Sequence, residues 1–163
     1  MISDRRCSRV MAVLGALGVG TFLAPRAMAV PANVNISKLT GYQTEPTIAI
    51  DPSNPNRLFA AANTSSDALF AARSMDGGKT WSYSDPSDGT IADGNDGLPV
   101  ACCDPYAVFD DFGNLFFTYL DSDFASGPNV VVVSSSNGGK TFAVRAKMRL
   151  GTTSKSPAYS QQI

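Results

Sequence analysis

The sequence contains the stretch SMDGGKTW at residues 74–81 and a related stretch, SSNGGKTF, at residues 135–142. Each begins with a serine, continues with an Asp or Asn two positions later and then two glycines, and ends on a large aromatic residue. Asp and Asn side chains bind the backbone of their own turn, and glycine accepts the positive φ angles of a tight hairpin. Both stretches are therefore expected to connect antiparallel strands. Their first residues are 61 positions apart.

A second pair of segments repeats at nearly the same distance. EPTIAID at residues 45–51 resembles DPYAVFD at residues 104–110, at an offset of 59. A turn rich in Asp and Asn follows each copy, and an apolar run follows each turn. The matching segments follow one another in the same order and are separated by nearly the same number of residues. This indicates an internal duplication, with units at about residues 45–84 and 104–150.

We predict four short strands in each unit, because apolar runs rich in Val, Ile, Phe and Tyr alternate with turns containing Gly, Pro, Asn and Asp. The predicted strands are residues 46–50, 57–62, 68–74 and 80–84 in the first unit and 106–110, 115–120, 129–134 and 141–145 in the second. Four short antiparallel strands repeated at a fixed period predict an all-β protein with about two blades of a β-propeller.

Residues 1–29 are expected to form a signal peptide. Three arginines precede an apolar run at residues 10–23, and Ala-Met-Ala at residues 27–29 provides a cleavage site. The apolar run is shorter than the about 20 residues that cross a bilayer, which disfavours the alternative of an uncleaved membrane anchor. We expect residues 30–163 to be exported to the periplasm or the extracellular medium, and to have no membrane attachment after cleavage.

Charge and composition exclude several classes of function. The chain has 163 residues, no histidine and a net charge of −1. Removing residues 1–29 takes away four arginines and one aspartate, which lowers the net charge to −4. A mildly acidic domain has no electrostatic reason to bind nucleic acid. Without histidine, the Ser-His-Asp triad and the common zinc-ligand sets are excluded, and we expect no metal or cofactor.

The two glycine-containing turns resemble the Asp-box of the bacterial neuraminidase (BNR) repeat, which belongs to the sialidase-like propeller family. Residues 74–81 carry the full pattern Ser-x-Asp-x-Gly-x-x-Trp, and residues 135–142 carry Asn and Phe in place of Asp and Trp. The matching positions are Ser74, Asp76, Gly78, Trp81, Ser135, Asn137, Gly139 and Phe142. The resemblance covers about residues 45–150.

This resemblance implies an exported, sialidase-like β-propeller, of a family that includes exo-α-sialidases and other glycoside hydrolases, and it does not imply catalysis by this chain. In that family the Asp-box is a structural hairpin remote from the active site, so Asp76 is expected to hold its turn and not to act as a catalytic acid. Asp-boxes also occur in non-catalytic propellers. The alternative function is therefore a propeller module that binds glycan or protein, with a glycan as the expected ligand.

The catalytic residues of sialidases are expected to be missing from this chain. Those enzymes hold the substrate carboxylate with an arginine cluster, for which a planar guanidinium is well suited, and use a Tyr–Glu pair as nucleophile. After residue 29 the chain has only Arg57, Arg73, Arg145 and Arg149. Its single glutamate, Glu45, stands at the head of a predicted strand. We name no catalytic residue.

Cys102 and Cys103 are adjacent, and they are the only cysteines after residue 29. In an oxidising compartment they can form a disulfide with each other or with another chain. Two free thiols are an equally weighted alternative. A cysteine pair without histidine is a poor zinc site.

The loop DGNDG at residues 93–97 offers carboxylate and amide oxygens, which calcium prefers. Its spacing matches no complete calcium-binding loop, and a polar connection between blades is the favoured interpretation.

Two blades are fewer than the about four to eight that close a propeller ring. The chain is therefore expected to be a fragment of a longer propeller, with residues near 155 beginning a third unit. Open sheet edges favour self-association, and we expect residues 130–133, four valines, to lie in one of the exposed strands.

Overall fold

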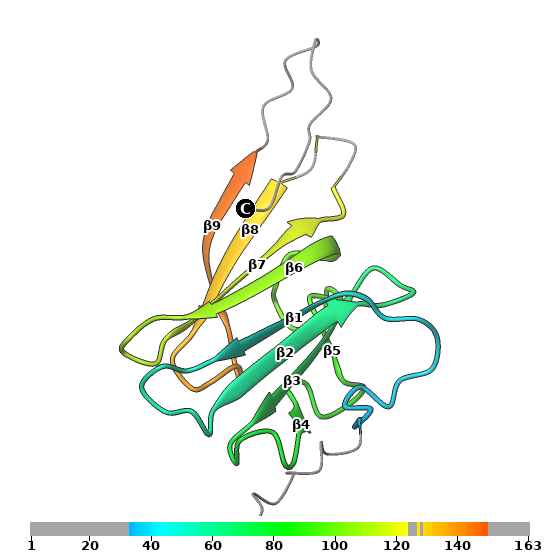
Figure 1. Ribbon diagram of the computed structural model, residues 1–163. Helices are drawn as coiled ribbons and strands as arrows, with labels where there is room; N and C mark the ends of the chain where they lie inside the picture. The colour runs from blue at the N-terminus through cyan, green and yellow to red at the C-terminus, as the bar shows by residue number, and fades with distance from the viewer. Residues whose placement is uncertain (1–32, 124–126, 128, 150–163) are drawn as a thin grey trace, which may run out of the picture. The chain divides into compact units, whose positions relative to one another are not determined.

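The computed structural model describes residues 33–123, 127 and 129–149, and this part of the chain folds as β-structure without an α-helix. Its strands form two antiparallel sheets, one of five strands and one of four (Figure 1). The prediction of an all-β fold is confirmed. The expected signal peptide and the expected start of a third unit near residue 155 lie outside the described residues.

The first sheet has the strand order β1-β2-β3-β4, with β5 pairing to β3 beyond β4. Its strands are β1 (Thr44–Ile50), β2 (Leu58–Asn63), β3 (Leu69–Ser74), β4 (Ser82–Tyr83) and β5 (Thr90–Ile91). The first three agree with the predicted strands to within two residues. The predicted strand at residues 80–84 shortens to β4 because Thr80 is held in the preceding turn by Asp76. The two-residue β5 was not predicted, since its apolar signal is a single isoleucine.

The second sheet has the order β6-β7-β8-β9. Its strands are β6 (Ala101–Phe109), β7 (Leu115–Asp121), β8 (Asn129–Ser135) and β9 (Ala143–Arg149). β6 begins earlier than predicted. Its pairing with β7 shifts register twice, once on either side of Cys103. β9 begins at Ala143, because Thr141 belongs to the turn, and it continues to Arg149.

The position of the four valines in the second sheet corrects one prediction. β8 pairs with β7 on one side and with β9 on the other, so it is an interior strand. Val131 and Val133 are fully buried. The expectation that residues 130–133 lie in an exposed strand is wrong, because the third strand of a four-stranded meander is flanked by its sequence neighbours.

One apolar core joins the two sheets. β6 contacts β1, β2 and β3, and the core includes residues from both sheets. Phe59 of β2 lies against Phe117 of β7, with ring centroids 5.3 Å apart in an edge-to-face arrangement. Phe59 and Phe117 are both fully buried, and truncating such a residue to Ala typically costs about 3–5 kcal/mol. The second unit thus packs on one face of the first.

Neither sheet is closed into a barrel; the outer strands are β1 and β4 in the first sheet, and β6 and β9 in the second. No helix in the described part of the chain has the length and apolar character needed to cross a membrane.

Candidate functional site

The turn at residues 74–81 connects β3 to β4 and is closed by its own side chains; we call it the first Asp-box, and the turn at residues 135–142 the second, after the motif they resemble. Ser74 Oγ donates to Asp76 Oδ1 at 2.8 Å and accepts from the Gly78 amide at 2.9 Å. Asp76 accepts from the amide and the hydroxyl of Thr80 at 2.9 and 2.6 Å. Trp81 Nε1 donates to the Gly78 carbonyl at 3.1 Å, so the indole ring is tied to the same turn.

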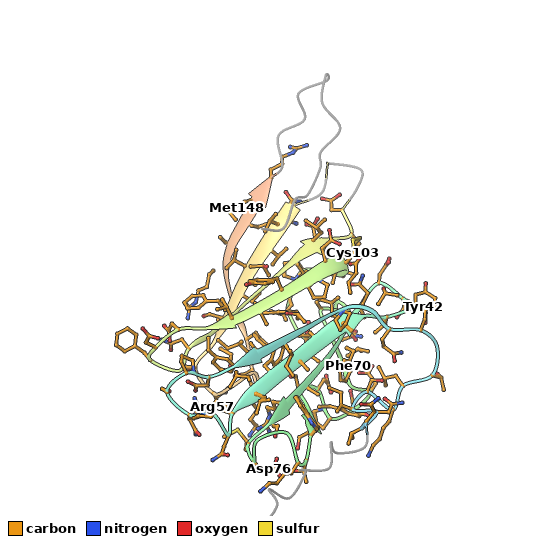
Figure 2. All side chains as sticks on the ribbon, viewed as in Figure 1. Tyr42, Arg57, Phe70, Asp76, Cys103 and Met148 are labelled. Atoms are coloured by element: carbon orange, nitrogen blue, oxygen red, sulfur yellow. A yellow bond between two sulfur atoms is a disulfide. The ribbon has the colours of Figure 1, made fainter. Side chains whose placement is uncertain are left out.

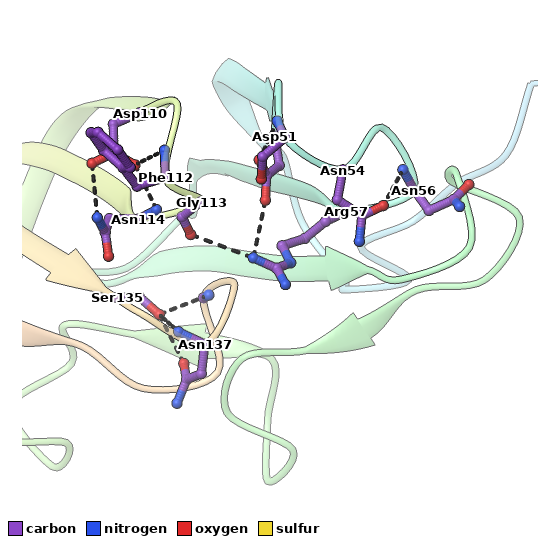
Figure 3. Close-up of polar contacts among 12 residues, drawn as sticks. Asp51, Asn54, Asn56, Arg57, Asp110, Phe112, Gly113, Asn114, Ser135 and Asn137 are labelled. Atoms are coloured by element: carbon purple, nitrogen blue, oxygen red, sulfur yellow. Dashed lines mark hydrogen bonds and ion pairs between the residues drawn. The ribbon is translucent and has the colours of Figure 1, made fainter.

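The second Asp-box connects β8 to β9 and repeats this arrangement (Figure 3). Ser135 Oγ donates to Asn137 Oδ1 at 2.8 Å and accepts from the Gly139 amide at 2.9 Å. Asn137 Oδ1 accepts from the Thr141 amide at 3.0 Å, and Asn137 Nδ2 donates to Thr141 Oγ1 at 2.8 Å. Replacing Asp by Asn therefore reverses the direction of one hydrogen bond and preserves the turn.

These contacts give Asp76 the character of an ionised turn residue. The hydroxyl of Thr80, followed by its amide, lowers the pKa of Asp76 from 3.8 to about 2. A carboxyl group with so low a pKa is a poor proton donor at neutral pH. The geometry of Asp76 is that of a hairpin stabiliser.

The second Asp-box also packs closely against the first sheet. A Cβ built on Gly139 would lie 2.5 Å from Phe59 Cδ2, and one built on Gly138 would lie 3.0 Å from Arg57 Cδ. Phe142, which follows the turn, has its ring centroid 5.7 Å from that of Phe59. The glycines allow the turn to approach β2 more closely than any other residue would.

A partly buried ion pair lies in the first unit, and its arginine also bonds to a turn of the second unit (Figure 3). Arg57 Nη1 donates to Asp51 Oδ2 at 3.0 Å and to the Gly113 carbonyl at 3.4 Å. Asp51 is fully buried. Burial raises the pKa of Asp51, but the Ser53 hydroxyl and amide and the Arg57 charge outweigh burial, so the pKa lies below its usual value. This network fixes the turn before β2 against the turn between β6 and β7.

A groove of about 580 Å³ lies beside the first Asp-box and is lined by both residues of β4. Four cationic side chains line it, one each from the segment before β1, from β3 and from the two Asp-box turns: Lys38, Arg73, Lys79 and Lys140. Trp81 and Tyr83 supply aromatic surface. Among the described residues that line this groove there is no Asp or Glu. We call it the cationic groove.

The two cysteines form a disulfide in the structure, between Cys102 and Cys103 of β6. Both are half-buried, and Asp104, which follows them, has a positive φ of 58°. Figure 2 shows Cys103 well separated from Asp76 of the first Asp-box. The disulfide and the cationic groove are therefore different sites.

The carboxylates of the loop at residues 93–97 are directed to their own backbone. Asp96 accepts from the amides of Ala92 and Leu98 at 2.7 and 3.0 Å. Asp93 accepts from the amide of Asn95 at 2.9 Å, and this bond, together with that from the Asn95 side chain, lowers the pKa of Asp93. Within the described ranges, no group of three or more Cys, Asp or Glu residues is placed to hold a metal ion.

Three of the charged residues considered for catalysis bond to different partners. Arg57 binds Asp51 as described, and Arg145 Nε donates to Ser134 Oγ at 2.7 Å. Glu45 accepts from Asn63 Nδ2 at 2.8 Å. These contacts bring neither of the two arginines nor Glu45 into a shared site.

Sequence reasoning did not identify the cationic groove. Lys79 and Lys140 occupy the same position of the two Asp-boxes, and this was a usable signal. Lys38 and Arg73 are 35 residues apart in sequence and meet in the groove through the tertiary fold.

No family model matches the chain, and no curated protein matches it in sequence.

Proposed function

We propose that the two sheets are adjacent blades of a sialidase-like, Asp-box β-propeller, and that the protein is exported and works on glycans. The observation that carries this proposal is the pair of Asp-box hairpins. Each lies between the third and fourth strand of its unit, and in each the serine and the Asp or Asn make matching hydrogen bonds. A duplicated hairpin of this detail is typical of a repeat architecture.

The packing of the two units supports an arrangement of successive blades. Ala49 and Phe59 of the first sheet are buried beneath the second unit. Their equivalents in the second sheet, Val108 and Phe116, are 47% and 38% exposed. A repeat that buries an apolar face against its neighbour leaves the same face uncovered on the last repeat described. A further blade is the partner that this face fits.

We propose that this chain belongs to a glycan-processing propeller and does not itself carry the catalytic residues. Arg57 and Arg145 are engaged in contacts within the chain, and Glu45 binds Asn63. None of these contacts resembles an arginine cluster opposite a Tyr–Glu pair.

The alternative is a propeller module that binds glycan or protein without catalysis. The cationic groove favours this alternative, because it combines charged side chains with the aromatic rings of Trp81 and Tyr83. Polar groups that fix orientation, placed beside aromatic surface, are typical of ligand sites.

The proposal is tested by two assays on the purified protein. With a fluorogenic sialic-acid conjugate we expect no release of fluorophore, while a known sialidase in the same buffer serves as the positive control. On a glycan array we expect retention of a subset of glycans. Turnover of the conjugate would contradict the assignment of a non-catalytic chain, and an empty array would contradict a role in glycan binding.

Export is tested separately. Residues 1–29 are fused to a phosphatase reporter that is active only outside the cytoplasm, and we expect phosphatase activity. A fusion with the apolar run at residues 10–23 interrupted by two lysines is the control. Equal activity of the two fusions would contradict export through this segment.

A further inference from the structure

We propose that the cationic groove is a binding site for an acidic saccharide chain, one that carries carboxylate or sulfate groups on neighbouring sugars. The anionic character of the ligand is inferred from the groove alone. Its saccharide character rests on the proposed glycan-related function.

The first argument is the local excess of positive charge. Lys38, Arg73, Lys79 and Lys140 line one groove, although the whole chain has 13 basic and 14 acidic residues. The ion pairs found in the described part of the chain involve other residues, Arg57 with Asp51 and Lys147 with Asp121. Like charges gathered in one groove repel one another, and an anionic ligand reduces this repulsion.

Asp76 and Asp85, in the turns that flank the groove, make their hydrogen bonds within those turns. Asp76 accepts hydrogen bonds from Ser74 and Thr80 in its own turn. Asp85 accepts from the amide and hydroxyl of Ser87 at 2.7 and 2.6 Å. Both carboxylates are held by their turns, and neither forms an ion pair with a groove cation in the part of the chain described.

The second argument is an unpartnered donor at Arg73. The Nε atom of Arg73 is buried and has no hydrogen-bond partner among the described residues. A buried donor without an acceptor destabilises a protein. Arg73 also lines the groove, and a guanidinium accommodates a carboxylate or sulfate group well because it can bind one in a bidentate manner.

The third argument is the fixed aromatic surface. Trp81 and Tyr83 are half-buried, and the polar atom of each is already used: the indole donates to the Gly78 carbonyl and the phenol to the Ser37 carbonyl at 2.6 Å. Their rings are therefore held in place and present apolar area. A sugar ring has an apolar face of C–H groups that packs on such area, whereas a free inorganic anion has none.

The charge of the whole protein argues for a saccharide over a nucleic acid. A net charge of −1 gives no long-range attraction for a densely charged polyanion. Recognition must come from the groove, whose volume of about 580 Å³ is within the range of clefts that hold small ligands. An oligosaccharide of a few acidic sugars fits this description.

The test measures binding of the full chain to four probes by calorimetry at fixed salt. These are oligogalacturonate, sulfated dextran oligomers, neutral dextran oligomers of the same length, and a short single-stranded DNA. We expect binding of at least one of the two acidic saccharides, and the one that binds identifies the anionic group. We expect no binding of neutral dextran and weaker binding of DNA.

Variants then locate the site. Arg73→Gln, and separately Lys79→Gln with Lys140→Gln, are each expected to weaken binding about tenfold or more, the loss typical of a charge-assisted hydrogen bond. Arg145→Gln removes the same charge from a residue that does not line the groove and should change affinity by less than about twofold. The two lysines are exposed, so that double variant keeps the test valid if Arg73→Gln unfolds the protein.

Three outcomes would overturn the inference: neither acidic saccharide binding more tightly than neutral dextran, unchanged affinity in the lysine double variant, or preference for DNA. Retention of neutral glycans on the array without binding of acidic oligomers would remove this inference and leave the proposed glycan-binding function standing.

Discussion

Gly139 of the second Asp-box lies so close to Phe59 of β2 that a Cβ on the glycine would be 2.5 Å from the Phe59 ring. Phe59 is fully buried, and its ring also contacts Phe117 and Phe142. One glycine therefore determines how near the turn of the second unit comes to the sheet of the first. The contact couples the local geometry of an Asp-box to the packing between repeats.

Gly139→Ala should destabilise the protein by about 2–4 kcal/mol. The new methyl group would overlap Phe59, and φ at this position is +88°, which an L side chain rarely adopts. The free energy of unfolding is measured by urea denaturation. Gly97→Ala is the matched control, because Gly97 has φ of +79° and a Cβ there meets nothing within 4 Å. If both variants lose the same stability, backbone strain alone accounts for the effect and the contact with Phe59 contributes nothing.

Ser135→Ala should cost about 1–3 kcal/mol of stability. The hydroxyl of buried Ser135 accepts from the Gly139 amide and donates to Asn137 Oδ1, and its removal leaves a buried amide without an acceptor. Exposed Ser136, the next residue, gives the control variant Ser136→Ala. A shift of the urea midpoint in Ser135→Ala no larger than in Ser136→Ala would show that the hydroxyl does not hold the turn.

Asp51 should make stability depend on pH in the acid range. Its folded-state pKa is below the usual value of 3.8, so the unfolded chain binds more protons and stability rises with pH through this region. The contribution is fully present above about pH 4 to 5 and is lost as pH falls through the folded-state pKa. Asp76, whose pKa is about 2, acts in the same direction.

Asp51→Asn tests this dependence. The variant should be less stable than the wild type at pH 7, and the difference between their urea midpoints should shrink as the pH falls toward 2. Asp67→Asn, at an exposed carboxylate, should follow the wild-type curve. A constant difference between Asp51→Asn and wild type from pH 7 to 2 would mean that the ionised Asp51–Arg57 pair does not stabilise the fold.

The strands could be predicted from sequence because their signals are local. Short apolar runs mark β2, β3, β7 and β8, and turns that contain Asp or Gly separate them. The two-residue β5 could not be predicted, since its apolar signal is a single isoleucine and its pairing partner β3 is about 20 positions earlier in the sequence. The interior position of β8 follows from strand order, and the four valines alone do not reveal it.

The hydrogen bonds of Ser74 and Ser135 within their turns could also be expected from sequence, because the partners are two to four residues away. The cationic groove could not, since it needs the segment at Lys38 to reach β4. Tyr83 provides that contact by donating to the Ser37 carbonyl. The bond from Arg57 to the Gly113 carbonyl likewise joins residues that are 56 positions apart. Chemistry assembled by tertiary contacts leaves no periodic pattern in the sequence.

Phe116→Lys should weaken self-association of the protein. Phe116, Val108, Tyr106 and Met148 are between 38% and 52% exposed, and the first three lie together on the outer face of β6 and β7, where Val108 pairs with Phe116. An apolar sheet face of this kind favours contact with a second copy or a further blade. A buried lysine opposes such contact because its charge must be desolvated.

Sedimentation velocity over a range of protein concentrations measures the effect. We expect the wild type to associate with rising concentration, and Phe116→Lys to raise the dissociation constant by about tenfold or more. Phe112→Lys is the matched control. Phe112 is 88% exposed in the turn between β6 and β7, so this substitution adds the same charge away from the apolar face. A monomeric wild type at every concentration, or equal effects of the two lysines, would contradict docking through the outer face of the second sheet.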